Sequence, residues 1–319
     1  MVNQGQGTFR LFRIAGIDVF LHWTWLVVAL IEIEGRGSKY SSIPWNVLEY
    51  LALFLIVLLH EFGHALACRQ VGGTADRIML WPLGGVAYVN PPQRPGATLW
   101  SIAAGPLVNV ALFPILWGAF AYVKMNGWAL TMHDEYLFVR AVFAIDIGLL
   151  IFNLLPVYPL DGGQIVRSLL WFVLGRGRSL MVTTVLSFVG IAGLIVLAVL
   201  TRSAWTVIIA VFMLMNCWGG LQRARALLKL AKIPRRPGYA CPSCRTAPPL
   251  GTFWKCAQCG KPFDTFETNG VCPHCSARYA TTTCLDCRES YPMDAWAGGR
   301  VVDAAGGFGA ATTQSQSTS

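Results

Sequence analysis

The chain has 319 residues, of which 55% are hydrophobic and only 13% are charged, and its mean hydropathy is +0.51. These values exclude an ordinary soluble globular protein and are typical of a membrane protein with several spans. The formal net charge of +9 becomes smaller when the cysteine pairs described below are counted as zinc-bound thiolates, so it predicts contact with a lipid bilayer surface rather than with nucleic acid.

Apolar runs along the chain predict six membrane-spanning helices, because a helix needs about twenty residues to cross the hydrocarbon core. The fourth run ends in two prolines and an Asp-Gly-Gly turn, after which an apolar stretch resumes at 164–174. We therefore expect an α-helical polytopic membrane protein. Its predicted spans cover 17–33, 47–69, 99–123, 137–155, 180–200 and 204–218.

Lysine and arginine are distributed unevenly between the two sides of these spans. If the N-terminus lies on the inner side, most of them flank the inner ends, and the outer loops carry only Arg36, Lys39, Lys124 and Arg202. Cytoplasmic loops are enriched in positive residues. Both termini are therefore expected in the cytoplasm, with the protein in the cell membrane.

The second span contains three ionisable residues, in the run His60-Glu61-Phe62-Gly63-His64. Ionisable side chains are rare in hydrocarbon unless they serve a function. Positions i and i+4 share a helix face, so both imidazoles can bind one Zn²⁺ while Glu61 acts on a zinc-bound water. The alternatives are a chance match or a structural zinc pair, but a structural site has no use for Glu61.

A catalytic zinc usually has three protein ligands and a water, so a third residue is needed. Asp161 is the best candidate, because the fourth span runs inward and brings it to the depth of His64. The prolines before it break the helix, which is tolerated at membrane depth only where the segment is buried in protein or lines a wet cavity. Alternatively, Asp161 caps the helix that begins near Gln164.

Other polar or flexible positions near this depth are candidates for substrate binding. Asn153 can hydrogen-bond a substrate backbone or an oxyanion, and Asn109 has the same interpretation. The alternative for both is hydrogen bonding between helices, which we favour for Asn109. Gly84 and Gly85 can offer a backbone edge to an extended substrate, or they form a tight turn.

Four further residues have weaker signals. His22, at a similar depth in the first span, is either an accessory polar group or a histidine bonded to neighbouring backbone, and we favour the second. Asp146 lies inside the fourth span, and its role stays open. Cys68 and Cys217 stand alone and are interpreted as small apolar packing residues.

These motifs together resemble the site-2 protease family of intramembrane zinc metalloproteases. The resemblance covers about 12–218 and is carried by His60–His64, Gly105-Pro106-Leu-Val-Asn109, Asn153 to Gly163, and the linker Trp81-Pro82-Leu83-Gly84-Gly85-Val86. It implies a six-helix core with one catalytic zinc on His60, His64 and Asp161. It also implies Glu61 as general base and a membrane-spanning protein as substrate, as in regulated intramembrane proteolysis.

The polar segment after the last span contains four Cys-x-x-Cys pairs about a dozen residues apart, which is the spacing of zinc ribbons. A cytoplasmic location argues against disulfides, and so small a segment needs metal to fold. We expect two structural Zn²⁺, one on the first four cysteines and one on the last four. The alternative joins the two middle pairs and leaves the outer two pairs for the second ion. The eight ligands are Cys241, Cys244, Cys256, Cys259, Cys272, Cys275, Cys284 and Cys287.

Composition divides the chain into a transmembrane metalloprotease core at 1–233, a double zinc ribbon at 238–290 and a disordered tail at 291–319. Few residues of the ribbon are basic, so we expect a cytoplasmic protein partner there and no nucleic acid. The leading hypothesis is an intramembrane zinc endopeptidase. The alternative is a non-catalytic zinc-binding scaffold or sensor that presents the ribbons to partners. The intact Glu61 favours the enzyme, since a binding site has no need of it.

Overall fold

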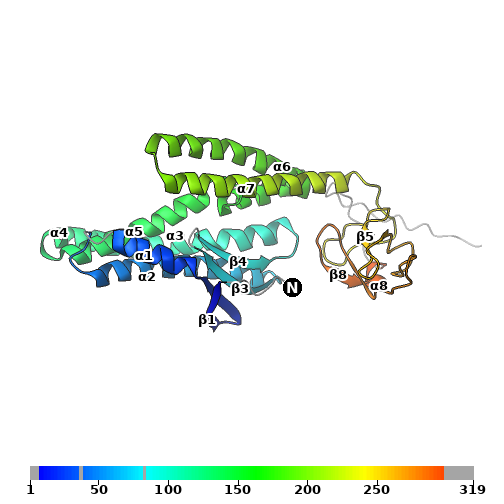
Figure 1. The fold of residues 1–319 in the computed structure, drawn as a ribbon, viewed down its shortest axis with the longest axis horizontal. Coiled ribbons are helices and arrows are strands. Elements are labelled where there is room, and N and C mark those ends of the chain that lie inside the picture. Colours follow the sequence, from blue (N-terminus) through cyan, green and yellow to red (C-terminus); the bar gives the residue numbers. More distant parts are fainter. Residues whose placement is uncertain (1–6, 36–38, 82–83, 298–319) are drawn as a thin grey trace, which may run out of the picture. The chain divides into compact units, whose positions relative to one another are not determined.

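A computed structural model describes residues 7–35, 39–81 and 84–297 (Figure 1). Two compact units divide the chain. The first comprises 1–169 and 183–218, and the second comprises 170–182 and 219–319. Pro82 and Leu83 of the expected linker, and 298–319 of the expected tail, lie outside the described residues.

The first unit contains a four-stranded sheet in the order β1-β2-β3-β4. β1 (Thr8–Ile14) pairs antiparallel with β2 (Ile17–His22), which pairs parallel with β3 (Thr74–Trp81). β3 then pairs antiparallel with β4 (Gly84–Asn90). β4 is therefore an edge strand, with one row of backbone groups outside the ladder.

One face of the sheet packs against the helix α2 (Ile43–Gln70). In β2 the buried Ile17 and Val19 alternate with half-buried neighbours, as expected for a strand with one face on a core, and β3 buries Ala75 and then three consecutive residues from Ile78 to Leu80. The buried cluster includes Ile17, Val19, Ile78 and Leu80 from the strands and Val57, Leu58, Ala65 and Cys68 from α2. The sheet thus lies beside the half of α2 that holds the histidine motif.

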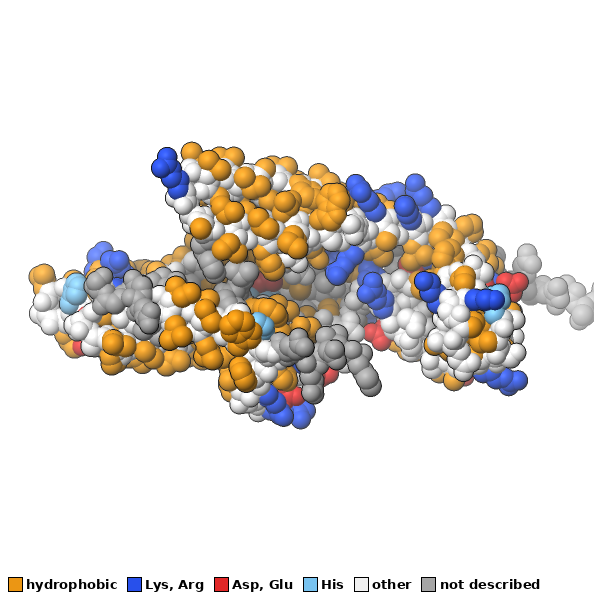
Figure 2. All heavy atoms as spheres, viewed as in Figure 1, with side chains coloured by type: hydrophobic (Ala, Val, Ile, Leu, Met, Phe, Trp, Pro, Cys, Tyr) orange, Lys and Arg blue, Asp and Glu red, His pale blue; other side chains and the backbone are white. Residues whose placement is uncertain are grey.

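Five helices are long and apolar enough to cross a membrane in the part of the chain that the structure describes. They are α2, α3 (Pro95–Met125), α5 (His133–Leu154), α6 (Asp161–Thr201) and α7 (Ala204–Ala231). The short helices α1 (Thr24–Gly35) and α4 (Trp128–Thr131) precede α2 and α5 respectively. Figure 2 shows hydrophobic side chains over the outer surface of α6 and α7, as lipid contact requires.

The expected first span, 17–33, is not one continuous helix. Residues 17–22 form β2, and Ile17 and Val19 are fully buried in the sheet core. α1 has 12 residues, which at 1.5 Å per residue reach only about 18 Å of a hydrocarbon core about 30 Å thick. The apolar run therefore combines a buried strand with a short helix.

The expected stretches 164–174 and 180–200 belong to one element, α6, which is broken at Gly175. The backbone there has φ 75° and ψ 171°, in the region that glycine adopts without a side-chain penalty. Residues 170–182 around this break belong to the second unit.

The cysteine-rich segment contains two small hairpins and a short helix. β5 (Trp254–Lys255) pairs with β6 (Pro262–Phe263), and β7 (Thr281–Thr283) pairs with β8 (Ser290–Pro292). α8 (Met293–Trp296) follows. The ordered segment therefore extends past residue 290, where we expected a disordered tail to begin, because Trp296 is fully buried against Phe266 and the cysteines.

Candidate metal centre

His60 and His64 lie one turn apart on α2, and both are buried. Their Nε2 atoms are 3.1 Å apart. The i, i+4 spacing places the two rings on one helix face, as the sequence predicts. Two nitrogen donors therefore converge on a single point inside the first unit.

Asp161 is the first residue of α6, and its side chain reaches the two imidazoles. Its Oδ2 lies 3.0 Å from Nε2 of His60 and 3.3 Å from Nε2 of His64. Ligand atoms at about 2.0–2.1 Å from a tetrahedral zinc lie about 3.3 Å from one another. The three donors therefore fit a zinc ion in both chemistry and spacing.

The outer nitrogens of both rings are fixed by hydrogen bonds to oxygen atoms of α3. Nδ1 of His60 lies 2.6 Å from Oδ1 of Asn109, and Nδ1 of His64 lies 2.9 Å from the carbonyl oxygen of Ser101. A carbonyl oxygen only accepts, so each Nδ1 carries the proton and donates it. Each Nε2 then keeps its lone pair for a metal.

The helix α3 approaches the histidines closely because residue 105 has no side chain. A Cβ atom built on Gly105 would collide with Nε2 of both His60 and His64. Gly105 is the first residue of the Gly-Pro-Leu-Val-Asn motif, so this motif in the sequence already indicated where α3 can approach another helix closely. The backbone of α3 thus forms one wall of the site.

Glu61 is buried beside the histidines, and the strand β4 holds its carboxylate. The backbone N–H of Ala87 donates to Oε2 of Glu61 at 2.7 Å. A Cβ atom on Gly85 would collide with the Glu61 carboxyl group. The bond from Ala87 shows that this N–H points away from β3, so the free edge of β4 faces Glu61.

The other candidate residues are placed differently. Asn109 is fully buried, and its amide group is engaged by His60 and by Asp146, so it joins three helices. Asn153 is half-buried in the last turn of α5. Gly84 begins β4, opposite Trp81. His22 forms a hydrogen bond of 2.6 Å with the hydroxyl of Thr24 and stacks on Trp81.

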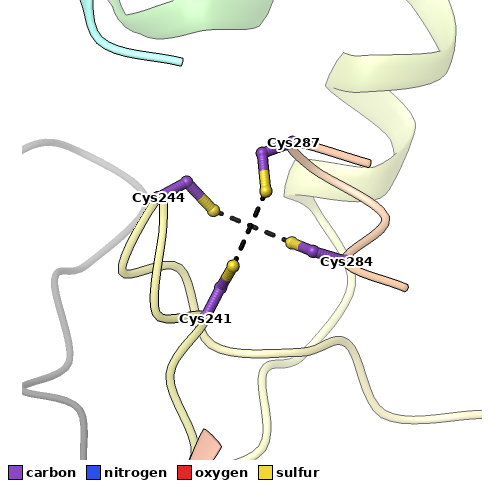
Figure 3. Close-up of side chains that lie close together, drawn as sticks. All are labelled: Cys241, Cys244, Cys284 and Cys287. Carbon is purple, nitrogen blue, oxygen red and sulfur yellow. Dashed lines mark hydrogen bonds between the residues drawn. The ribbon is translucent and has the colours of Figure 1, made fainter. Parts of the chain in front are cut away.

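The eight paired cysteines form two clusters in the second unit, and their pairing is nested. One cluster joins the first and last pairs, Cys241, Cys244, Cys284 and Cys287 (Figure 3). The other joins the middle pairs, Cys256, Cys259, Cys272 and Cys275. The sequential pairing that we expected is therefore wrong, and the alternative is correct. Its physical cause is the core around Phe266 and Trp296, which brings the two ends of the segment together.

Both clusters have the dimensions of a tetrahedral thiolate site. In the first cluster the Sγ atoms are 3.6 Å apart in Cys241 and Cys287 and 3.7 Å apart in Cys244 and Cys284. In the second cluster they are 3.5 Å apart in Cys256 and Cys275 and 3.8 Å apart in Cys259 and Cys272. Thiolates at about 2.3 Å from zinc lie about 3.8 Å from one another. The clusters therefore fit one zinc ion each.

Hydrogen bonds favour the ionised form of some of the thiols in both clusters. The Cys241, Cys284 and Cys287 thiols lower the pKa of Cys244. The backbone N–H of Cys259 and the hydroxyl of Tyr279 lower the pKa of Cys256 to about 6. The thiolate is the form that binds metal.

Comparison with known proteins finds similar sequences over the membrane part of the chain. Residues 49–134 and 129–197 match the model of peptidase family M50. A zinc metalloprotease of Methanocaldococcus jannaschii is 34% identical over 165 residues, which are 51% of this chain and 45% of that protein. Stage IV sporulation protein FB of Bacillus subtilis is 30% identical over 158 residues, or 47% of this chain and 46% of that protein.

The chain thus spans about half the length of these curated relatives. Among solved structures, the site-2 protease from Methanocaldococcus jannaschii aligns with a TM-score of 0.47 and 25% sequence identity. The alignment covers 67% of this chain and 95% of that one.

Proposed function

Because residues 49–134 and 129–197 match the model of peptidase family M50, we propose that this integral membrane protein is a zinc endopeptidase of the site-2 protease kind. Its substrate would be another membrane-spanning protein, cleaved in or near a transmembrane segment. One observation carries the proposal: three ligand atoms, from His60, His64 and Asp161, converge beside the buried carboxylate of Glu61. A structural zinc site closes with four protein ligands, whereas a catalytic one keeps a position open.

The chain supplies the remaining parts of a peptide hydrolysis. A zinc ion held by these three residues would lower the pKa of a water to about 7 and polarise the substrate carbonyl. Glu61 would take a proton from the attacking water and give it to the leaving amine. The N–H of Ala87 holds the Glu61 carboxylate in place for this transfer.

The substrate would bind as an added strand on β4. Backbone groups alternate in direction along a strand, so the free N–H and C=O groups of Gly85 and Val89 face the same side as Ala87. An extended peptide paired there would have its backbone beside Glu61. The substrate helix must unwind locally for this pairing, because helical backbone groups are already bonded to one another.

The test compares Glu61→Gln with the wild type in reconstituted full-length protein. Cleavage of single-span substrate proteins and zinc content are both measured. The variant is expected to keep its zinc and to lose at least about 10²-fold in cleavage rate, since general base catalysis contributes about that much. Glu135→Gln, at the start of α5, is the matched control and should behave as wild type.

Three further outcomes test the ligand role of Asp161, the role of Glu61, and the choice between an enzyme and a non-catalytic scaffold. Asp161→Ala is expected to lose the zinc held by the histidines, and full retention would remove Asp161 as a ligand. Equal cleavage by Glu61→Gln and wild type would contradict the role of Glu61. Zinc binding without cleavage of any substrate would favour a scaffold.

We also propose that the cysteine clusters hold two structural zinc ions and that the ribbons bind a cytoplasmic protein partner. Their thiol spacing supports the metal count. Five long spans alone would put the two ends of the chain on opposite sides of the membrane, but the pairing of β2 with β3 brings the N-terminal strands to the side on which α2 ends. Together with the positive residues beside the inner ends of the spans, this pairing supports cytoplasmic termini and a location in the cell membrane. Protease protection of a C-terminal tag in sealed vesicles of known orientation tests the topology, and external cleavage of the tag in right-side-out vesicles would contradict it.

A further inference from the structure

Asp146 is a fully buried carboxylate on α5, in a helix that is otherwise apolar enough to cross a membrane. Its Oδ1 accepts a hydrogen bond of 2.7 Å from Nδ2 of Asn109. Its Oδ2 has no hydrogen-bond partner among the described residues. A buried intramembrane carboxylate is costly, so its presence calls for a function.

The bond to Asn109 continues to the metal site. Asn109 uses the nitrogen of its amide on Asp146 and the oxygen on His60, at 2.7 and 2.6 Å. The three residues come from α5, α3 and α2 respectively, so the chain of bonds crosses three helices. A carboxylate, an amide and an imidazole are therefore connected in series behind the ligand atom of His60.

The order of donors in this series is set at the carboxylate end. A carboxylate only accepts, so Asn109 must turn its NH₂ group toward Asp146 and its oxygen toward His60. The oxygen then requires a proton on Nδ1 of His60, which leaves the lone pair of Nε2 for the metal. With an amide in place of Asp146 the series can reverse, and His60 would then present Nε2–H to the site.

We propose that Asp146 is a positioning residue that, through Asn109, fixes the tautomer and orientation in which His60 binds zinc. The inference rests on the proposed zinc site and deepens it, because it assigns a residue that touches neither metal nor substrate. Outer partners of metal-binding histidines typically change metal affinity by about 10- to 100-fold.

The experiment measures zinc retention by full-length protein against rising chelator concentration, without substrate. The zinc that is absent from a His64→Ala variant defines the core zinc, and the rest is the ribbon zinc. Asp146→Asn is expected to lose the core zinc at about 10- to 100-fold lower chelator concentration. Asp134→Asn, which removes a carboxylate from the first turn of the same helix, is expected to match the wild type.

A second variant exchanges the two groups. Asn109→Asp combined with Asp146→Asn places a carboxylate directly on Nδ1 of His60 and an amide behind it. The carboxylate at position 109 again requires a proton on Nδ1 of His60 and leaves the lone pair of Nε2 for the metal. The exchanged variant should therefore retain its core zinc almost as well as the wild type. A residue that served only in helix packing would give no such recovery. The exchanged variant still has one carboxylate and one amide at these two positions. It therefore tests the positioning role of Asp146 even if the single variant Asp146→Asn misfolds and loses ribbon zinc.

Two results would overturn the proposal: unchanged core zinc retention in Asp146→Asn, or no recovery in the exchanged variant. These differ from failure of the proposed function. If the wild type holds only ribbon zinc, the metal site itself is wrong. If core zinc responds as expected but no substrate is cleaved, the positioning role stands and the protease activity does not.

Discussion

Gly105 stands where any side chain would meet the metal-facing nitrogens of His60 and His64. Gly105→Ala should therefore reduce the zinc content by one ion per chain, because the methyl group occupies the position of the ligand atoms. Gly118→Ala is the matched control on the same helix, since a Cβ atom there meets open space. Metal analysis of both purified variants checks the prediction, and full zinc content in Gly105→Ala would contradict the geometry.

Gly85 has the same relation to Glu61 that Gly105 has to the histidines. Gly85→Ala should displace the Glu61 carboxyl group but leave the zinc ligands in place. A displacement of about 1 Å can reduce a rate by about 10²-fold, so cleavage should fall by that order while zinc content stays constant. Val86→Ala, whose side chain is exposed in the same strand, is the control. Loss of zinc together with activity would mean that the strand supports the whole site.

For single residues, the sequence predicts those that lie within one turn of the same helix and those that complete the ligand set of a zinc ion. His60, Glu61 and His64 are placed by helical periodicity, and Asp161 by the need for a third ligand. The partnership of Asn109 with Asp146 was not predictable. It depends on the rotation of α3 and α5 relative to each other, which apolar runs without a marked polar face do not specify.

The edge strand β4 makes a prediction at the level of the element. Val89→Pro removes one backbone N–H from the free edge but leaves the side that pairs with β3 intact, since the Val89 N–H faces the same way as that of Ala87. Binding of an extended substrate should weaken, and a rise in KM with constant zinc content is expected. Val89→Ala keeps the N–H and serves as the control. Equal KM values for the two variants would contradict strand addition.

Helix boundaries show where apolar length misleads. The run at 17–33 has the composition of a span, yet 17–22 pairs with β1 and β3. The half-buried Asp18 and Phe20 alternate with the buried Ile17 and Val19, a period of two that marks a strand. The break in α6 was predictable only as an interruption. The expected stretches 164–174 and 180–200 leave a gap that contains Gly175, where two helical segments of α6 meet at a non-helical residue.

The nested ribbon makes a prediction for the whole molecule. The double variant Cys256→Ser with Cys272→Ser should lose one zinc per chain, because both residues belong to the middle cluster. Cys244→Ser with Cys256→Ser should lose two, because the residues belong to different clusters. Sequential pairing would reverse the two results. Metal analysis of the purified full-length variants distinguishes them directly.

Spacing alone did not decide this pairing, because the gaps of 11, 12 and 8 residues between neighbouring cysteine pairs suit either pairing. The decisive contacts are apolar ones: Phe266, between the middle pairs, and Trp296, beyond the last pair, pack into the cluster that contains Cys241. Trp296 lies in a segment whose composition indicates disorder. Composition predicts a division of the chain into membrane core and ribbon, whereas the arrangement within the ribbon required the tertiary contacts.

Nesting also fixes the order in which the two ribbon sites can close during synthesis. Cys241 and Cys244 leave the ribosome first, but their partners Cys284 and Cys287 are made last. The middle site is complete once Cys275 has emerged, so it can fold around its ion while the first pair is still waiting. A chain that stops anywhere between Cys275 and Cys284 would therefore keep all four ligands of the middle site. It would lack two of the four ligands of the outer site, although that site begins first in the sequence.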